Sequence, residues 1–280
     1  MDFTIYASKT KGASHNKNKL PNQDWYKVQV LNRALIIAVA DGHGSSRCTF
    51  SKDGARIVTS VFCDVVNDIF KTFTNNSSFC EEIKKIKSTE LPARIIDCWN
   101  DRVIKDFQQT KSVGSDSGLM GSIKPETYKE IYQKYGTTLI GLVIADDFYF
   151  GIQIGDGDIL SVFQDRSIQH VIEPEVILGV ETYSLSSTDA ASHFISRLEI
   201  PSRIEDMPVL FTLSTDGLSN SYVDRHAFDN VAEFYLDELK NRELSNRKLN
   251  RTLKTITSLG SGDDITLVIA GNLKRIRSEN

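Results

Sequence analysis

Alternation of apolar and polar side chains along the chain predicts the first strands. Residues 3–8 and 26–31 alternate, as half-buried strands do, whereas residues 34–40 form an unbroken apolar run that is typical of a strand buried on both faces. Asn32-Arg33, between the last two segments, fits a tight hairpin turn. Further strands are predicted at 137–145, 148–154, 159–163, 209–213 and 265–270. Short acidic or glycine-containing turns join the first three of these, which together predict a β-meander.

A second periodicity, with apolar residues three and four positions apart, predicts long helices. The predicted helical segments cover residues 51–73, 88–109 and most of 226–258. Thr49 or Ser51 is the expected N-terminal cap of the first helix. The polar stretch 75–78 predicts a loop between helices, and the polar, glycine-containing stretch 110–122 predicts a mobile loop.

Strands lie at both ends of the chain and helices lie between them, without an internal repeat or a recognisable linker. This order predicts a single α+β domain over residues 1–280. A content of 40% hydrophobic and 25% charged residues is ordinary for a soluble globular protein, so a substantial core is expected.

Charge and targeting signals limit the partners and the location. The chain has 33 basic and 37 acidic residues, a net charge of −4 and no long run of one sign, so neither nucleic acid nor a membrane is expected as a partner. No apolar stretch approaches the ~20 residues that span a bilayer, and the N-terminus lacks a secretory signal. A cytoplasmic location is therefore expected. The cysteines lack the close pairs of zinc or redox motifs, which predicts reduced thiols at Cys48, Cys63, Cys80 and Cys98.

Candidate chemistry is concentrated in four acidic islands at the edges of apolar segments. They are Pro21-Asn22-Gln23-Asp24, Asp41-Gly42-His43-Gly44, Thr215-Asp216-Gly217 and Gly262-Asp263-Asp264. Carboxylates at strand ends can converge on one point, where their oxygens suit hard divalent cations. Each island alone also fits an ordinary turn or helix cap, so the metal site is predicted from the combination.

The order of these islands resembles the metal-dependent serine/threonine protein phosphatases of the 2C family over almost the whole chain. Two further segments, Tyr135-Gly136-Thr137-Thr138 and Ile154-Gly155-Asp156-Gly157-Asp158, extend the resemblance, and the last island continues it as Ser261-Gly262-Asp263-Asp264-Ile265-Thr266. The opening Gly12-Ala13-Ser14-His15, with the first acidic island, is similar to a divergent bacterial branch of that family.

The resemblance implies a central sandwich of two antiparallel β-sheets flanked by α-helices, with a metal site in a cleft at one end. It also implies two Mg²⁺ or Mn²⁺ ions that share a bridging water, with Asp41 bound to both. Asp216 and Asp263 would complete the shell of one ion, the Gly42 carbonyl would reach the other, and Asp24 would orient water. The implied substrate is a phosphorylated protein, whose counterpart is a serine/threonine kinase.

The residue types in the second island fit the same chemistry. Two cations would acidify an attacking water and neutralise charge on the phosphoryl oxygens. His43 would then protonate the departing seryl or threonyl oxygen, a task that suits an imidazole.

Three positions depart from the pattern of the family. Gln23 stands where many relatives have Glu, but its amide can still hold a water on a cation. Lys19 falls where relatives often use Arg to bind phosphate, and Lys lacks the bidentate fork, although His15 and Lys17 could assist. Asn220 stands where relatives often carry an Asp for a third metal ion. Asp156 would be the other contributor to this third site, unless its role is only to close a turn. Because Asn220 brings no charge, the third site is expected to be weak. Thr137 and Thr138 are expected to be structural, because β-branched residues suit a strand start.

Two other functions remain open from the sequence. The first is a degenerate phosphatase fold that binds phosphoproteins or regulates a kinase, which Gln23, Lys19 and Asn220 would favour. The second is a hydrolase of small phosphorylated metabolites or nucleotides, but no glycine-rich phosphate loop is present.

Overall fold

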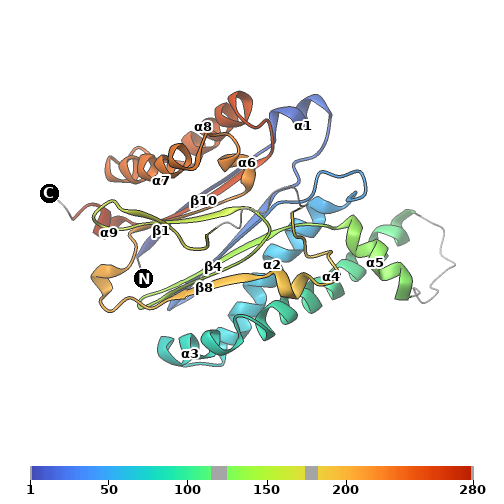
Figure 1. Cartoon of the computed structure of the whole chain (residues 1–280), viewed down its shortest axis with the longest axis horizontal. Helices are drawn as coiled ribbons and strands as arrows, with labels where there is room; N and C mark the ends of the chain where they lie inside the picture. Colours follow the sequence, from blue (N-terminus) through green and yellow to red (C-terminus); the bar gives the residue numbers. More distant parts are fainter. Residues whose placement is uncertain (1, 115–124, 174–181, 279–280) are drawn as a thin grey trace.

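Two antiparallel β-sheets, packed face to face, form the centre of the computed structural model, which describes residues 2–114, 125–173 and 182–278 (Figure 1). Within that part of the chain each sheet has five strands. One sheet has the order β1 (Phe3–Thr10), β10 (Ile265–Asn272), β9 (Leu210–Ser214), β6 (Asp158–Val162) and β7 (Ile168–His170). The other has the order β2 (Trp25–Val30), β3 (Ala34–Ala40), β4 (Leu139–Ala145), β5 (Tyr149–Ile154) and β8 (Ile195–Glu199).

Helices cover both outer faces of the sandwich, as Figure 1 shows. The helices α2 (Ser51–Lys71), α3 (Asn76–Ile86), α4 (Glu90–Gly114) and α5 (Pro125–Lys134) lie on the side of the β3 sheet. The helices α7 (Arg225–Lys240) and α8 (Asn246–Leu259) lie on the other side. Shorter helical segments are α1 (Ala13–Lys17), α6 (Asp216–Ser219), α9 (Leu273–Ile276) and the 3₁₀ turns Ala190–His193 and Ile204–Asp206. The predicted α+β sandwich is therefore confirmed.

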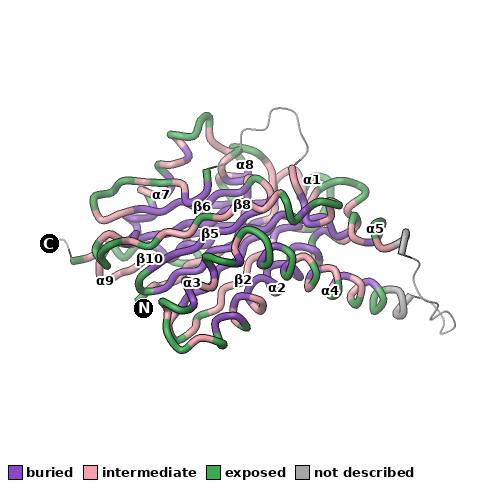
Figure 2. The backbone as a smooth tube through the Cα atoms, turned by 60° about the horizontal axis from the view of Figure 1, so that its bottom comes forward, coloured by how far each residue is buried: buried purple, intermediate pink, exposed green. Residues whose placement is uncertain are grey.

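Strand β3 shows why its sequence is apolar at every position. Successive side chains of a strand point to opposite faces of the sheet. Leu35, Ile37 and Val39 pack between the two sheets, against residues such as Phe211 and Val268. The alternate residues of β3, which are Ala34, Ile36, Ala38 and Ala40, pack against the helices on the outer face. Both faces of the strand are therefore buried. Figure 2 shows the buried backbone at the centre of the molecule.

The eight predicted strands are all present, and the structure adds two that were not predicted. Strands β7 and β8 are short edge strands in which no residue is fully buried, so they lack a clear apolar signal. The turn between β2 and β3 is closed by the Leu31 amide, which donates to the Ala34 carbonyl at 2.8 Å. No helix in the described part of the chain is both long and apolar enough to cross a membrane.

Several helix boundaries differ from those predicted. Residues 226–258 form two helices, and the chain turns between them at Arg242, whose φ is +60°. The predicted loop at 75–78 is wrong, because Asn75 caps α3 by accepting a hydrogen bond from the Ser78 amide at 2.8 Å. Helix α4 continues to Gly114, so the loop prediction is also wrong for residues 110–114, and residues 115–122 lie outside the described residues.

The start of α2 also differs from the prediction. Phe50 is the residue at the N-terminal boundary and forms no side-chain cap, and Ser51 is the first helical residue. Cys63 and Cys80 are buried, in keeping with cysteines that fill the core.

Helix α2 packs so closely on the segment before β4 that only glycine fits at position 54. A Cβ atom there would lie 1.9 Å from the Tyr135 carbonyl oxygen, and the Gly54 carbonyl accepts a hydrogen bond from the Trp99 indole. This contact holds Tyr135 and Gly136 just before Thr137 and Thr138, which border the cleft described below.

We expect Gly54→Ala to destabilise the protein by about 3 kcal/mol, because a clash with backbone outweighs the ~1 kcal/mol that alanine gains in a helix. The control is Asp68→Ala on the same helix, at a side chain that is 77% exposed. It should change the free energy of unfolding by less than about 0.5 kcal/mol. Equal urea midpoints for the two variants would contradict the close packing.

Candidate metal and active site

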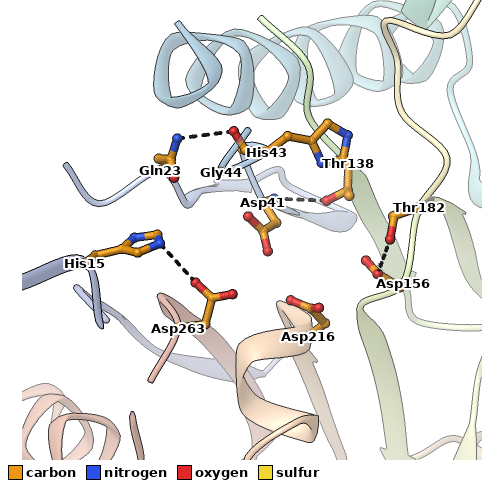
Figure 3. Close-up of a pocket in the computed structure, with 11 residues that line it drawn as sticks. His15, Gln23, Asp41, His43, Gly44, Thr138, Asp156, Thr182, Asp216 and Asp263 are labelled. Carbon is orange, nitrogen blue, oxygen red and sulfur yellow. Dashed lines mark hydrogen bonds and ion pairs between the residues drawn. The ribbon is translucent and has the colours of Figure 1, made fainter. Parts of the chain in front are cut away.

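A cleft of about 180 Å³ lies at one end of the sandwich, where several strands end (Figure 3). Asp41 follows β3, Asp216 comes two residues after β9, Asp263 comes two residues before β10, and Asp156 lies in the turn between β5 and β6. The side chains and backbone that line the cleft belong to His15, Gln23, Asp41, Gly42, His43, Gly44, Thr138, Asp156, Thr182, Asp216 and Asp263. Eight of the ten residues predicted for the site therefore meet there. The other two, Asp24 and Lys19, are not among the lining residues.

The backbone of Asp41 is fixed by the two threonines that precede β4. The Asp41 carbonyl accepts hydrogen bonds from the Thr137 hydroxyl at 2.7 Å and from the Thr138 amide at 2.9 Å. The Asp41 amide donates to the Thr138 hydroxyl at 3.0 Å. Both threonines are structural, as predicted, and what they fix is the direction of the Asp41 side chain into the cleft.

Asp216 is close enough to Asp41 for its charge to affect the pKa of Asp41. Burial, together with the charges of Asp24 and Asp216, raises the pKa of Asp41 well above its usual range. Burial and the nearby Asp156 charge also raise the pKa of Asp216 to about 6. The second oxygen of Asp216, Oδ1, is buried and has no hydrogen-bond partner in the described structure.

Asn220 adds a neutral contact to the same carboxylate. Its side-chain amide donates to Asp216 Oδ2 at 2.9 Å, from four residues further along the chain. The position that was expected to weaken a third metal site thus orients Asp216 in this protein.

Asp24 lies behind the cleft and is completely buried. Its Oδ2 accepts a hydrogen bond from the Thr215 hydroxyl at 2.8 Å, and the same hydroxyl accepts from the Thr266 amide at 2.9 Å. Its Oδ1 is buried without a partner in the described structure. Burial and the charge of Asp264 raise the pKa of Asp24 to about 8. Asp24 therefore couples the first acidic island to the two islands near the C-terminus.

The two carboxylates of the last acidic island point in different directions, one toward the cleft and one toward the interior. Asp263 lines the cleft and its side chain is 49% exposed, whereas the Asp264 side chain is 2% exposed. Asp264 accepts hydrogen bonds from the Gly12 and Gln23 amides, both at 2.6 Å. His15 lies between the pair, with Nε2 3.4 Å from Asp263 and Nδ1 3.1 Å from Asp264. Asp264 thus holds the N-terminal segment that carries His15 and Gln23 against the cleft.

Gln23 holds the chain beside His43. Its side-chain amide donates to the Ser51 hydroxyl at 2.7 Å and to the His43 carbonyl at 3.2 Å, while its carbonyl oxygen is buried without a partner in the described structure. Position 42, just before His43, requires glycine, because a Cβ atom there would lie 2.7 Å from the Ser51 backbone. The His43 amide donates to the Gly136 carbonyl at 3.1 Å.

Asp156 and Lys19 occupy more open positions. Asp156 is exposed on the wall of the cleft, where the Thr182 hydroxyl donates to its Oδ2 at 2.6 Å. The preceding Gly155 has φ +103°, so this residue makes the tight turn that places Asp156. Lys19 is exposed and has φ +55°, a backbone conformation that is unusual for lysine.

The side chains in the cleft offer oxygen donors, the type of ligand that suits a hard divalent cation. Asp41, Asp216 and Asp263 present carboxylate oxygens to one cleft, and the buried Asp216 Oδ1 and Gln23 Oε1 atoms there lack partners in the described structure. In residues 2–114, 125–173 and 182–278, no three acidic, histidine or cysteine side chains are already arranged as ligands of a single ion.

Sequence reasoning missed the roles of Asp264, Thr215 and Thr182. Asp264 stands beside Asp263 in the same island, and only the burial of one and the exposure of the other distinguish them. Thr215 precedes Asp216, so its place in that island was a usable signal. Thr182 has no motif around it, and nothing in the sequence marks it.

Most of the chain matches one known protein family. Residues 11–254 match the family model described as Protein phosphatase 2C. No curated protein sequence matches the chain.

Solved structures with the same fold include two bacterial phosphatases. The serine/threonine phosphatase PstP/Ppp of Mycobacterium tuberculosis is 12% identical, with 97% of this chain and 99% of that chain covered and a TM-score of 0.56. The serine/threonine phosphatase Stp1 of Staphylococcus aureus is 13% identical, with 97% and 94% covered and a TM-score of 0.58. The catalytic domain of PstP in complex with two manganese ions is 13% identical, with 96% and 97% covered and a TM-score of 0.51. At these identities the likeness shows the fold.

The raised pKa values of Asp24, Asp41 and Asp216 predict that the metal-free protein loses stability as the pH rises. The folded state holds protons that the unfolded state releases near pH 4, so their stabilising effect is complete below that pH. For Asp24 it is lost as the pH approaches about 8. In EDTA, the free energy of unfolding should fall between pH 5 and pH 8, by at most about 1.4 kcal/mol per pH unit for each group.

Asp24→Asn provides the control for this measurement, since the amide does not titrate. The slope of stability against pH should become shallower in this variant. An unchanged slope in urea titrations at pH 5, 6, 7 and 8 would show that Asp24 is already ionised in the folded protein.

Proposed function

Because this chain belongs to the protein phosphatase 2C family, we propose that it is a metal-dependent protein serine/threonine phosphatase. The observation that carries the proposal is the meeting of Asp41, Asp216 and Asp263 with His43 around one cleft. The substrate would be a phosphoserine or phosphothreonine side chain of a protein. A protein kinase would supply that substrate.

Two Mg²⁺ or Mn²⁺ ions would be held by Asp41, Asp216 and Asp263, with the Gly42 carbonyl and the Gln23 side chain toward the second ion. The manganese ions in the PstP complex support this choice of metal. Bound in the cleft, the cations would acidify a water for direct attack on phosphorus and neutralise charge on the phosphoryl oxygens. Asp156 would contribute to a third, weaker site, since Asn220 brings no charge and already bonds Asp216.

The side chains around the carboxylates have separate tasks in this proposal. His43, on the wall of the cleft, donates a proton to the departing seryl or threonyl oxygen. Asp24, whose Oδ1 lacks a partner in the described structure, accepts from a water at the base of the site. His15 faces the phosphoryl group from the wall formed by the N-terminal segment, and Lys19 adds positive charge outside the cleft.

We expect Asp216→Asn to lower kcat/KM for a phosphothreonine peptide with Mn²⁺ at least 100-fold, because the amide carries no charge to hold a cation. EDTA should abolish phosphate release from the wild-type protein, and added Mn²⁺ should restore it. The control is Asp101→Asn, at an exposed carboxylate on α4. This variant should keep the wild-type rate.

Failure of the folded wild-type protein to release phosphate at any Mn²⁺ or Mg²⁺ concentration would reject the enzyme. Retained binding of the phosphopeptide in that case would favour a phosphoprotein-binding module.

His43→Gln should separate substrates by their leaving groups. A general acid contributes about 10²- to 10⁴-fold where the leaving oxygen needs a proton, as an alkoxide does. An aryl oxide is a stable anion and needs little help. The variant should therefore lose about 100-fold on a phosphothreonine peptide and less than about tenfold on an aryl phosphate. Equal losses on both substrates would assign His43 to binding or folding instead.

A further inference from the structure

Two segments far apart in the sequence contain no acidic residue at all. Residues 3–23 carry Lys9, Lys11, Lys17 and Lys19, and residues 244–262 carry Arg247, Lys248, Arg251 and Lys254. Of the 33 basic residues in the chain, 8 lie in these segments, whereas all 37 acidic residues lie elsewhere. The net charge of −4 therefore conceals a separation of charge.

The fold brings these two segments together. Helix α8 lies along β1, and Asn246 on α8 accepts a hydrogen bond from the Ala7 amide of this edge strand at 3.0 Å. Asn250, one turn further along α8, donates to the Ser8 hydroxyl at 2.9 Å. At the other end of the helix, Thr257 accepts from the Ala13 amide at 3.1 Å, so α1 lies beside the end of α8 (Figure 1).

The exposed side of α8 is basic along its length. Leu249, Leu253 and Thr257 are buried and mark the side that packs on the sheet. Arg247, Arg251 and Lys254 are exposed and recur at i, i+4 and i+7, which places them along one stripe on the opposite side. Lys17 and Lys19 are exposed beyond the end of the helix. We call these five residues the basic face. Within the part of the chain that the structure describes, none of the five forms an ion pair with a carboxylate.

The basic face begins at the edge of the cleft. His15, which lines the cleft, precedes Lys17 by two residues within α1. Thr257 on α8 donates its hydroxyl hydrogen to the carbonyl of Asp263, which also lines the cleft. The end of α8 and the α1 segment that carries Lys17 therefore both adjoin residues of the cleft.

We propose that the basic face binds an acidic segment of the phosphoprotein substrate, next to the phosphorylated residue in the cleft. The inference rests on the proposed phosphatase activity and adds the sequence preference of the same site. Lys254 and Arg247 are about 10 Å apart along the helix axis, which about three residues of extended peptide span. The preferred substrate would thus carry several Asp or Glu residues on one side of its phosphoserine or phosphothreonine.

An acidic protein segment fits this face better than a nucleic acid does. A nucleic acid carries charge at every phosphate, so a strand that covered the whole face would continue over the Asp263 and Asp216 carboxylates. An acidic peptide places its carboxylates only where its sequence has them. Charge complementarity of this kind speeds association and selects partners, and salt weakens it.

The test compares two phosphothreonine peptides, with tracts of four glutamates or of four glutamines on both sides. The substituted protein is the triple variant Arg247→Gln, Arg251→Gln, Lys254→Gln, in which glutamine preserves helix propensity. The control is Lys84→Gln, Lys85→Gln, Lys105→Gln, which removes three exposed positive charges from α3 and α4 on the opposite side of the sandwich (Figure 1).

We expect the wild-type protein to prefer the glutamate peptide in kcat/KM by roughly tenfold at low salt, and less at 0.5 M NaCl. The α8 variant should lose this preference and keep its activity on the glutamine peptide within about twofold, whereas the control should keep the preference. Equal kcat/KM values for the two peptides with the wild-type protein, or an unchanged preference in the α8 variant, would overturn the proposal.

Binding of a fluorescent glutamate peptide without phosphate separates this inference from the proposed activity. The wild-type protein should bind it more tightly than the α8 variant even in EDTA. If the wild-type protein binds the glutamate peptide more tightly than the α8 variant but hydrolyses neither phosphopeptide, the basic face is supported as a binding surface and the phosphatase activity is rejected. Hydrolysis of the glutamine peptide, without tighter binding of the glutamate peptide, would support the phosphatase activity and reject the basic face as a binding surface. Tighter binding of a single-stranded oligonucleotide than of the glutamate peptide would overturn the choice of an acidic protein segment.

Discussion

Repulsion among buried carboxylates is the constraint on which the cleft depends. Asp24 is completely buried and Asp41 and Asp216 are half-buried, so burial and their mutual charges raise the pKa of all three and oppose their ionisation without a positive charge beside them. Bound protons reduce the repulsion in part, as the raised pKa values of the three carboxyl groups indicate. A divalent cation would displace those protons and compensate the carboxylate charges more fully. Cation affinity and proton release are therefore coupled in this site, and affinity should rise with pH.

The surrounding fold opposes that repulsion through its backbone. Strands β9 and β10 are antiparallel neighbours, so the end of one lies beside the beginning of the other, and Asp216 and Asp263 meet for that reason. Asp41 is held from its backbone by Thr137 and Thr138, which leaves its carboxyl group facing the cleft. Asp264 turns its charge inward to bind the Gly12 and Gln23 amides, and so attaches the N-terminal segment. Asp41 is thus set by contacts of its backbone, whereas Asp156 and Asp216 are also held through one carboxylate oxygen each, by Thr182 and Asn220.

Local sequence signals predicted the elements and the acidic strand ends well, because these depend on short-range periodicity and on turn residues. The apolar run of β3 and the islands at Asp41 and Asp216 are examples. What the sequence could not show depends on pairing over long distances. Asp263 and Asp264 look alike in the sequence, and only the start of β10 decides which one faces the cleft. The break at Arg242 has no glycine or proline to mark it, and Lys19, which also has a positive φ, does not line the cleft.

The same limitation applies to charge. Read along the sequence, no run of basic residues is long enough to indicate a polyanionic partner. In the structure, residues 3–23 and 244–262 lie side by side, and their charges combine because α8 covers the edge of β1. The resulting face lies next to a cleft of opposite charge, and α1 contributes Lys17 to the face and His15 to the cleft. Since fields at a surface fall off over about 10 Å in 0.1 M salt, a ligand close to α1 would experience both. Cations would be drawn to the carboxylates and acidic side chains to α8, so the two partners of the proposed reaction would be attracted to neighbouring and different surfaces.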